Sequence, residues 1–510
     1  MKRGWIYGLV LVLMLAWTAG GVDGAPTGKV VVGMAGEPST FDPHRITGTP
    51  ISRALPNVFD TLLWRSRGGG IIPHLAKSYR LVTPTVWEFK LRKGIKFTNG
   101  EPLDAHAVKY SIERIKDPKL KSRQYGYFRS LDHVEVVDRY TVRVHTKYPD
   151  MFIISPFSQY GQIVPPKYYK SHDLKYLARH PVGSGPFTMV RWKKGQEIVY
   201  EANPNYWKPG VPRVKTAITK KIPEPTTRVA ALAAGDVDLI DAIPPQLVPL
   251  VKSKPNLEVL AGPGVRTCYI NMVIKPGAPW ADVRVRRALN YAVDKDTIIK
   301  YILQGHARKI AINVGPTSYG FNPDLKPYPY DPALAKKLLA EAGYPNGFSL
   351  DMDIPLGRYL MGKQAAEAVA GQWAKVGVKV NVRAVEWGVW VKHLKARWLP
   401  RSKPFLSWAC RSDTHLHSSG MHAGHIYGKS TWGGFRDKEV DRLLDDARAE
   451  PDPAKRLKKY HYVNRVIYEK AALVFLYQQN QIHGKHKRVD WKLGVVDHIY
   501  LMDIGLKPQN

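Results

Sequence analysis

The chain alternates marked helix starts with short runs of strand-forming residues, and this alternation limits its fold more than any other feature. The segments DPALAKKLLAEAGYPNGF (331–348) and DPAKRLKKYHYVNRVIYEKA (452–471) both begin with Asp-Pro. An Asp side chain can cap a helix, and proline suits the first turn, where no N–H is needed. Strand-like runs lie between the helical segments, namely VVVGM (30–34), VWEFKLR (86–92), TVRVHT (141–146), EIVYEA (197–202), KVNVRAV (379–385) and ALVFLY (472–477). This pattern predicts an α/β fold.

The first residues predict export of the chain. Two basic residues precede an apolar run, 5–19, that is too short to span a bilayer comfortably, and residues of modest size before Ala25 suit a cleavage site. We expect residues 1–24 to be a cleaved signal peptide, with an uncleaved anchor as the alternative. No cysteine follows the run, so no lipid anchor is expected, and no later segment is long enough to cross a membrane. The predicted location is the periplasm.

The length and the net charge of the chain limit the kinds of protein that it can be. The remaining residues, about 485, exceed one ordinary core, so at least two domains are expected. The chain has 77 basic and 43 acidic residues, and its net charge of +34 is spread without one dominant block. Such a field attracts anions, but no nucleic-acid-binding motif is present. Nucleic acid is therefore not an expected partner.

The stretch RSDTHLHSSGMHAGHIYG (411–428) holds the densest group of reactive side chains. These are Asp413, His415, His417, His422 and His425. Three or four imidazoles could bind zinc, nickel or copper, so a secreted metalloenzyme is one hypothesis. No H-E-x-x-H pattern is present, and the Gly and Ser residues indicate a loop; the alternative is that the histidines line a ligand cleft or lie on a hydrated loop. No enzyme motif appears elsewhere, and we expect neither catalysis nor a cofactor.

A series of motifs follows one order along the chain. They are EPSTFDPHR (37–45), HLAKSYRL with VWEFKLRKGIKFTNGEPLDAHAVKYSIERI (74–115), PVGSGPFTMVRW (181–192), ANPNYWKPGVPRV (202–214), RVAALAAGDVDLI (228–240), VRVRRALNYAVDKDTII (283–299), DPALAKKLLAEAGYPNGF (331–348) and FRDKEVDRLLDDARAE (435–450). In this order the chain resembles the family 5 extracellular solute-binding proteins of ABC transporters, the group of dipeptide, oligopeptide and nickel binders. The resemblance covers nearly the whole mature chain.

The resemblance implies an architecture and a function. The expected fold is the two-lobed periplasmic binding protein-like fold, type 2, of the large class with an extra subdomain, its lobes joined by two hinge crossings. Lobe I is expected at 28–266 plus 478–510, with the extra subdomain at 61–179, and lobe II at 267–477. Such proteins close on a solute and deliver it to a membrane permease. We therefore expect a monomeric substrate-binding protein of an ABC importer for a peptide or peptide-like solute, with an anionic opine- or sugar-type solute or a nickel chelate as alternatives.

The resemblance also implies site residues. In peptide-binding relatives an Asp of lobe II, just after a Trp-containing strand, accepts the ligand's α-ammonium, and Asp413 after Trp408 is the best match. Trp408 either stacks on the ligand or belongs to the core. His415 and His417 are the expected specificity determinants, and His422 and His425 are possible loop residues. The relatives' proline is absent here and histidines take its place, so the stretch supports a solute receptor more firmly than it supports a peptide.

The two cysteines fall at related places in this scheme. Cys268 lies in VRTCYINMV, just after the first expected crossing, and Cys410 lies in the strand that leads to Asp413. If these strands are neighbours, one intralobe disulfide is feasible in an oxidising compartment; free thiols are the alternative.

Overall fold

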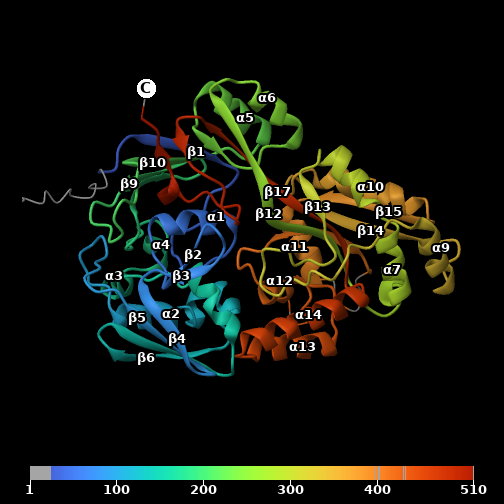
Figure 1. Ribbon diagram of the computed structural model, residues 1–510, viewed down its shortest axis with the longest axis horizontal. Coiled ribbons are helices and arrows are strands. Elements are labelled where there is room, and N and C mark those ends of the chain that lie inside the picture. Colours follow the sequence, from blue (N-terminus) through green and yellow to red (C-terminus); the bar gives the residue numbers. More distant parts are fainter. Residues whose placement is uncertain (1–24, 397, 400–402, 429, 431, 509–510) are drawn as a thin grey trace, which may run out of the picture.

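The protein has two α/β lobes connected by two long strands. The computed structural model describes residues 25–508 except 397, 400–402, 429 and 431. The predicted signal peptide, 1–24, lies outside the described residues. In Figure 1 the N-terminal half and the C-terminal end of the chain form one lobe, and helices α7 to α14 form the other. The expectation of a two-lobed α/β fold with two crossings is confirmed.

The strands carry the frame of both lobes. They are β1 (Lys29–Met34), β2 (Leu63–Arg65), β3 (Ile71–Pro73), β4 (Ala76–Thr83), β5 (Val86–Leu91), β6 (Leu131–Asp138), β7 (Thr141–Thr146), β8 (Phe187–Lys193), β9 (Glu197–Ala202), β10 (Thr216–Lys221), β11 (Leu239–Ile240), β12 (Leu257–Met272), β13 (Ala307–Lys309), β14 (Phe348–Pro355), β15 (Val378–Val385), β16 (Leu406–Ser412), β17 (Leu473–His486), β18 (Val489–Asp490) and β19 (Gly505–Leu506). Within the described part of the chain, eleven of them form one sheet in the order β15-β14-β16-β12-β17-β11-β1-β10-β9-β8, with β13 paired to β17.

The helices cover this sheet. They are α1 (Thr49–Ala54), α2 (Ala105–Arg114), α3 (Pro166–Ser171), α4 (Leu174–Leu177), α5 (Pro225–Ala234), α6 (Val248–Lys252), α7 (Val283–Tyr291), α8 (Lys295–Thr297), α9 (Pro332–Glu341), α10 (Gly362–Ala374), α11 (Trp387–Ala396), α12 (Ser418–His425), α13 (Lys438–Ala449) and α14 (Pro453–Glu469). Short-range signals set several starts: Asp331 accepts from the backbone of Leu334 at α9, and Asp452 accepts from Lys455 at α14. These are the caps that the Asp-Pro segments predict.

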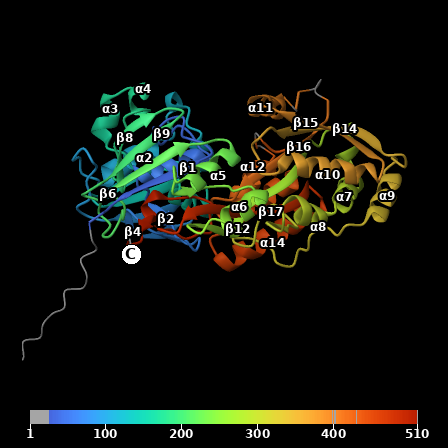
Figure 2. The same cartoon turned by 90° about the horizontal axis from the view of Figure 1, so that it is seen from above.

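The strands β12 and β17 join the lobes. They pair antiparallel from Leu257 opposite His486 to Asn271 opposite Leu473, and their register shifts between Pro263 and Arg266. Seen from above, the pair lies between the two lobes (Figure 2). Because the two connecting strands pair with each other, both links between the lobes lie side by side.

Alternate residues of β12 and β16 enter different cores. Cys268 and Trp408 belong to one buried cluster, whereas Tyr269 and Ala409 belong to a second cluster. This is the two-residue period of a strand that is covered on both faces. The alternation also determines which side chains of β16 lie on the face of the sheet that α12 covers.

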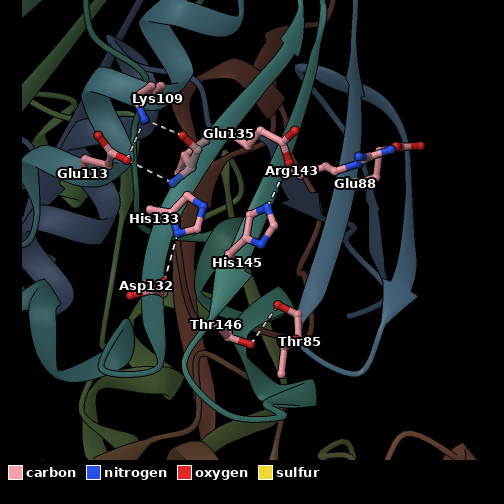
Figure 3. Close-up of polar contacts among 11 residues, drawn as sticks. Thr85, Glu88, Lys109, Glu113, Asp132, His133, Glu135, Arg143, His145 and Thr146 are labelled. Carbon is pink, nitrogen blue, oxygen red and sulfur yellow. Dashed lines mark hydrogen bonds and ion pairs between the residues drawn. The ribbon is translucent and has the colours of Figure 1, made fainter.

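A smaller four-stranded sheet, β4-β5-β7-β6, stands apart in the N-terminal lobe. One face packs with α2 into its own core, which includes Phe89, Val134 and Val144. The other face is polar, and Figure 3 shows its cross-strand contacts. Across the strands these join His145 to Glu135 (3.0 Å) and Arg143 to Glu88 (3.1 Å), and within β6 His133 contacts its chain neighbour Asp132 (2.9 Å). The sheet lies within the range 61–179 expected for an extra subdomain.

The two cysteines are bonded to each other. Cys268 of β12 lies directly opposite Cys410 of β16 in the ladder, and their sulfurs form a disulfide across a sequence separation of 142 residues. The bridge therefore ties β16 to β12, one of the two connecting strands.

Removing this disulfide is expected to destabilise its lobe. A bridge that closes a long loop restricts the unfolded chain, and its loss lowers the free energy of unfolding by about 2–5 kcal/mol. We expect a reductant to lower the melting temperature of the wild type and to leave that of the Cys268→Ala/Cys410→Ala double variant unchanged. Equal melting temperatures for reduced and oxidised wild type would contradict the bridge.

Candidate functional site

The stretch 411–428 lies where the two lobes meet. After β16 the backbone N–H of Asp413 donates to the carbonyl of Val265 (2.9 Å), so the strand pairing persists for one more residue. The chain then turns, with Leu416 at φ 47°, and His417 caps α12 by accepting from the backbone of Ser419 (3.1 Å). The loop is therefore fixed at both ends, by the sheet and by a helix start.

Asp413 is buried at this contact. Its Oδ2 accepts from the Ser318 hydroxyl (2.5 Å) and from the backbone N–H of His417 (3.0 Å), whereas its Oδ1 has no partner among the described residues. Burial raises the pKa of the Asp413 carboxyl to about 6, against the opposing Ser318 hydrogen bond and the positive charges of Arg65 and Arg411. The hydrogen bonds to Oδ2 therefore orient the carboxyl group and leave Oδ1 without a donor among the described residues.

His415 makes hydrogen bonds and ring contacts with residues of the other lobe. Its carbonyl accepts from Arg65 Nη2 (2.7 Å) and from the Ser155 hydroxyl (3.0 Å). Its ring lies among the rings of Tyr127 and Phe152, at centroid distances of 4.8 and 5.5 Å. Burial, followed by the charges of Arg65 and Arg411, holds the pKa of His415 well below its usual range. The imidazole is therefore neutral in this setting.

The other three histidines of the stretch face different surroundings. His417 stacks on Tyr319 (5.0 Å), His422 Nε2 contacts Asn464 Oδ1 (2.7 Å), and His425 Nδ1 contacts Asn271 Nδ2 (3.0 Å). Among the described residues, no three His, Cys, Asp or Glu side chains are arranged to hold a metal ion. Within the stretch, His415 and His417 both contact the ring of Phe152, whereas His422 and His425 face the side-chain amides of Asn464 and Asn271.

Trp408 is a core residue. Its side chain is 0% exposed and packs with the cluster that contains Cys268 and Tyr477. The alternation along β16 places it on the sheet face opposite to that of Arg411. Of the two roles expected for Trp408, the ligand contact is therefore corrected to core packing.

A second interlobe contact lies farther along the interface. Arg448 of α13 makes two hydrogen bonds to Asp150, from Nε to Oδ1 (2.6 Å) and from Nη2 to Oδ2 (2.5 Å). Asp150 also accepts from the hydroxyl of Ser130 and is completely buried. Sequence reasoning missed Arg65, Asp150 and Arg448, because no local pattern shows that residues 298 positions apart will meet.

A two-lobed α/β protein whose connecting strands lie beside a buried polar contact between the lobes belongs to the periplasmic binding protein class of the type 2 fold. The model of the bacterial extracellular solute-binding proteins, family 5, matches residues 70–400. The chain belongs to this family, whose members are transport binding proteins. Within the described residues, no helix has both the length and the apolar character needed to cross a membrane.

Individual relatives cover most of the chain. Heme-binding protein A of Haemophilus influenzae is 33% identical over 465 residues, which are 85% of this chain and 84% of that protein. The structure of DppA from Helicobacter pylori with the peptide STSA has a TM-score of 0.83 and 25% identity, and covers 94% of this chain and 98% of its own. That of AgaA from A. tumefaciens R10 with agropinic acid has a TM-score of 0.82 and 26% identity, and covers 95% and 99%.

Proposed function

We propose that this chain is the periplasmic substrate-binding protein of an ABC importer, and that it captures a peptide or peptide-like solute between its lobes for delivery to an inner-membrane permease. The observation that carries the proposal is the buried polar contact of the loop after β16 with Arg65 and Ser155 of the opposite lobe. Family membership and the peptide-bound DppA support it. The same proposal includes a cleaved signal peptide, no lipid anchor, a monomer and no catalytic activity.

The proposed motion is a hinge closure along β12 and β17. The lobe boundaries expected at 266/267 and 477/478 fall inside these two strands, near the register shift of their ladder. Backbone changes in two adjacent strands can rotate one lobe against the other without disturbing either core. Solute bound to both lobes then favours the closed form, which the permease reads.

Asp413 is the proposed anchor for the solute's ammonium. Oδ1 is the free acceptor of a carboxylate that Ser318 and His417 already orient through Oδ2. A buried cation needs a paired anion to offset its desolvation. His415, whose neutral ring lies against Tyr127 and Phe152 of the opposite lobe, and His417 are the proposed side-chain determinants of specificity.

Substituting Asp413 by asparagine tests this role. For a peptide with a free ammonium we expect about a 30-fold or greater loss of affinity in Asp413→Asn, since truncating one partner of a buried charge pair costs about 2–5 kcal/mol. Asp351→Asn on β14, whose carboxylate bonds Arg383 and Asn381, is the matched control and is expected to leave affinity unchanged. Titration calorimetry with peptides chosen by thermal shift measures both. Equal affinities for Asp413→Asn and wild type would remove Asp413 from the site.

A second candidate is an anionic solute, as in the agropinic-acid complex of AgaA. The observation that favours it is the local charge: Asp413 is accompanied by two buried guanidinium groups, those of Arg65 and Arg411. The metalloenzyme alternative has no such support, since no three His, Cys, Asp or Glu side chains of the described residues are arranged to hold a metal ion. The nickel chelate stays a further alternative solute.

A further inference from the structure

The segment between α2 and β6 presents a group of cations on the surface of the N-terminal lobe. This basic segment, residues 116–129 (KDPKLKSRQYGYFR), contains five basic residues and one acidic residue. The side chains of Lys119, Lys121, Arg123 and Arg129 are exposed, and Tyr125 among them is 41% exposed. The surface of the segment therefore consists mainly of positive charge with one aromatic ring.

The nearest acidic side chains along the chain already have partners. Asp117 Oδ1 accepts from the backbone N–H of Lys119 (2.8 Å), and Asp132 pairs with His133 (2.9 Å). None of the five cations of the basic segment forms an ion pair with a carboxylate in the part of the chain that the structure describes. Their charges are therefore available to an anion from outside the protein.

The backbone of the basic segment is anchored by a buried residue at every fourth position. Leu120, Gln124 and Phe128 are 3%, 0% and 0% exposed. The side chain of Gln124 donates from Nε2 to the carbonyl of Pro43 (2.5 Å) and accepts at Oε1 from the backbone N–H of Gly161 (3.2 Å). Because these anchors fix the chain between them, the cations stand in place before a partner arrives, which lowers the entropy lost on binding.

Lys121 has a backbone conformation that suits another residue better. It follows the turn Pro118–Leu120 with φ 49° and ψ 44°, in the left-handed region. Glycine and asparagine adopt this region at lower cost than lysine does. A strained residue that is kept at a surface position is a sign of function, so the lysine side chain at this position supports a use for its charge.

A second row of cations, on the outer face of α14, is placed less favourably. Lys455, Lys458 and Arg465 are exposed there at helical spacing. The adjacent helix α13 carries four carboxylates, and one of them, that of Asp446, pairs with Lys459 of α14 (3.0 Å). An anionic partner at α14 would be repelled by α13, whereas the basic segment has no such neighbour along its own length.

We propose that the basic segment binds the anionic phospholipid headgroups of a membrane surface. A single phosphate ion needs donors that converge on one point, whereas these cations alternate with buried anchors along fourteen residues and so match an extended anionic surface. Each Lys or Arg near such a surface strengthens binding by about fivefold. Tyrosine is enriched at the membrane interface, which fits Tyr125, and the net charge of +34 adds a long-range attraction to the same surface.

The basic segment also adjoins the contact between the lobes. The ring of Tyr127 lies 4.8 Å from the ring of His415. Binding to the inner membrane through this segment therefore keeps the interlobe site close to the membrane surface, where a permease lies. This consequence rests on the proposed function, whereas lipid binding by itself does not.

Sedimentation with vesicles tests the proposal. The mature protein is mixed with vesicles of phosphatidylglycerol and phosphatidylcholine in equal parts, or of phosphatidylcholine alone. We expect binding to the first only, and its loss in about 1 M sodium chloride, where the Debye length is about 3 Å. Lys119→Gln/Lys121→Asn/Arg123→Gln is expected to bind about 100-fold more weakly, since three cations are lost. The control Lys455→Gln/Lys458→Gln/Arg465→Gln loses the same net charge from α14 and is expected to bind like the wild type.

Further measurements separate a lost charge from a lost fold. Both triple variants are expected to keep the melting temperature and the solute affinity of the wild type, and Lys119→Arg/Arg123→Lys, which keeps both charges, is expected to keep vesicle binding. Equal weakening in the two triple variants would reduce the effect to net charge and overturn the basic segment as the site. Equal binding to both kinds of vesicle, or to neither, overturns the recognition of anionic lipid. Binding only to phosphatidylcholine vesicles that carry the permease, lost in the first triple variant, overturns the lipid and makes the permease the partner. Solute affinity is measured separately, so each of these failures leaves the proposed function intact.

Discussion

Arg448→Met is expected to weaken solute binding by about 100-fold, although Arg448 reaches the proposed specificity determinants His415 and His417 indirectly, through the ring of Phe152. Arg448 and Asp150 come from different lobes and form a bidentate, buried ion pair. Breaking a buried pair by removing one partner costs about 3–5 kcal/mol. If the lobes separate as proposed, Asp150 regains water in the open form, so the loss falls on the closed form and appears as lower affinity.

The measurement combines titration calorimetry with small-angle X-ray scattering. We expect Arg448→Met to need more solute before its radius of gyration contracts to that of the closed wild type. Arg442→Met removes an exposed positive charge from the same helix and serves as the matched control. Asp150→Asn combined with Arg448→Met is expected to lose less than the sum of the two single variants. An unchanged affinity in Arg448→Met would show that the ion pair does not stabilise the closed form.

Acid is expected to destabilise the folded protein strongly between pH 6.5 and 4. Burial lowers the pKa of four histidines to about 4, namely His44, His422, His483 and His498, and holds those of His415 and His417 well below the usual range. In this pH range the unfolded chain binds more protons than the folded chain, so the free energy of unfolding falls as pH falls. Each of the four shifts contributes about 3 kcal/mol once pH 4 is reached.

Asp413 acts in the opposite direction. Its folded-state pKa of about 6 lies above its ordinary value, so the folded protein gains protons first and is stabilised as pH falls from 6 toward 4. Burial also raises the pKa of Asp503, so two carboxyl groups oppose six histidines, and the net result is a loss of several kcal/mol. Melting temperatures from pH 7.5 to 4.5 test this, with a steeper fall expected for Asp413→Asn and a shallower one for His422→Gln. A melting temperature independent of pH would contradict the buried neutral histidines.

Local signals predicted many elements because short-range contacts form them. The expected strand 141–146 is β7, and the expected strand 197–202 is β9. Gly343 follows α9 with φ 90°, the conformation that a glycine after a helix end favours. These features need only neighbours within about five residues, so the sequence specifies them.

The segment ALVFLY shows a strand whose full length could not be predicted from the local sequence. It predicts a strand at 472–477, whereas β17 continues to His486 and crosses between the lobes. Residues 478–486 are rich in Gln, His and Lys and have no apolar alternation of their own. They are extended because β12 offers them a partner ladder over its full length, which is a property of the assembled sheet.

The sequence by itself determined the α/β class, the helix caps, the family resemblance and the importance of the stretch after Trp408. Only the tertiary structure decided the roles of these residues: Trp408 lies in a core, Asp413 accepts from Ser318, His415 contacts the other lobe, and His422 and His425 face separate amides. The physical reason is range. Caps and turns depend on adjacent residues, whereas burial, charge pairing and the direction of a side chain depend on which distant segments the sheet brings to its two faces.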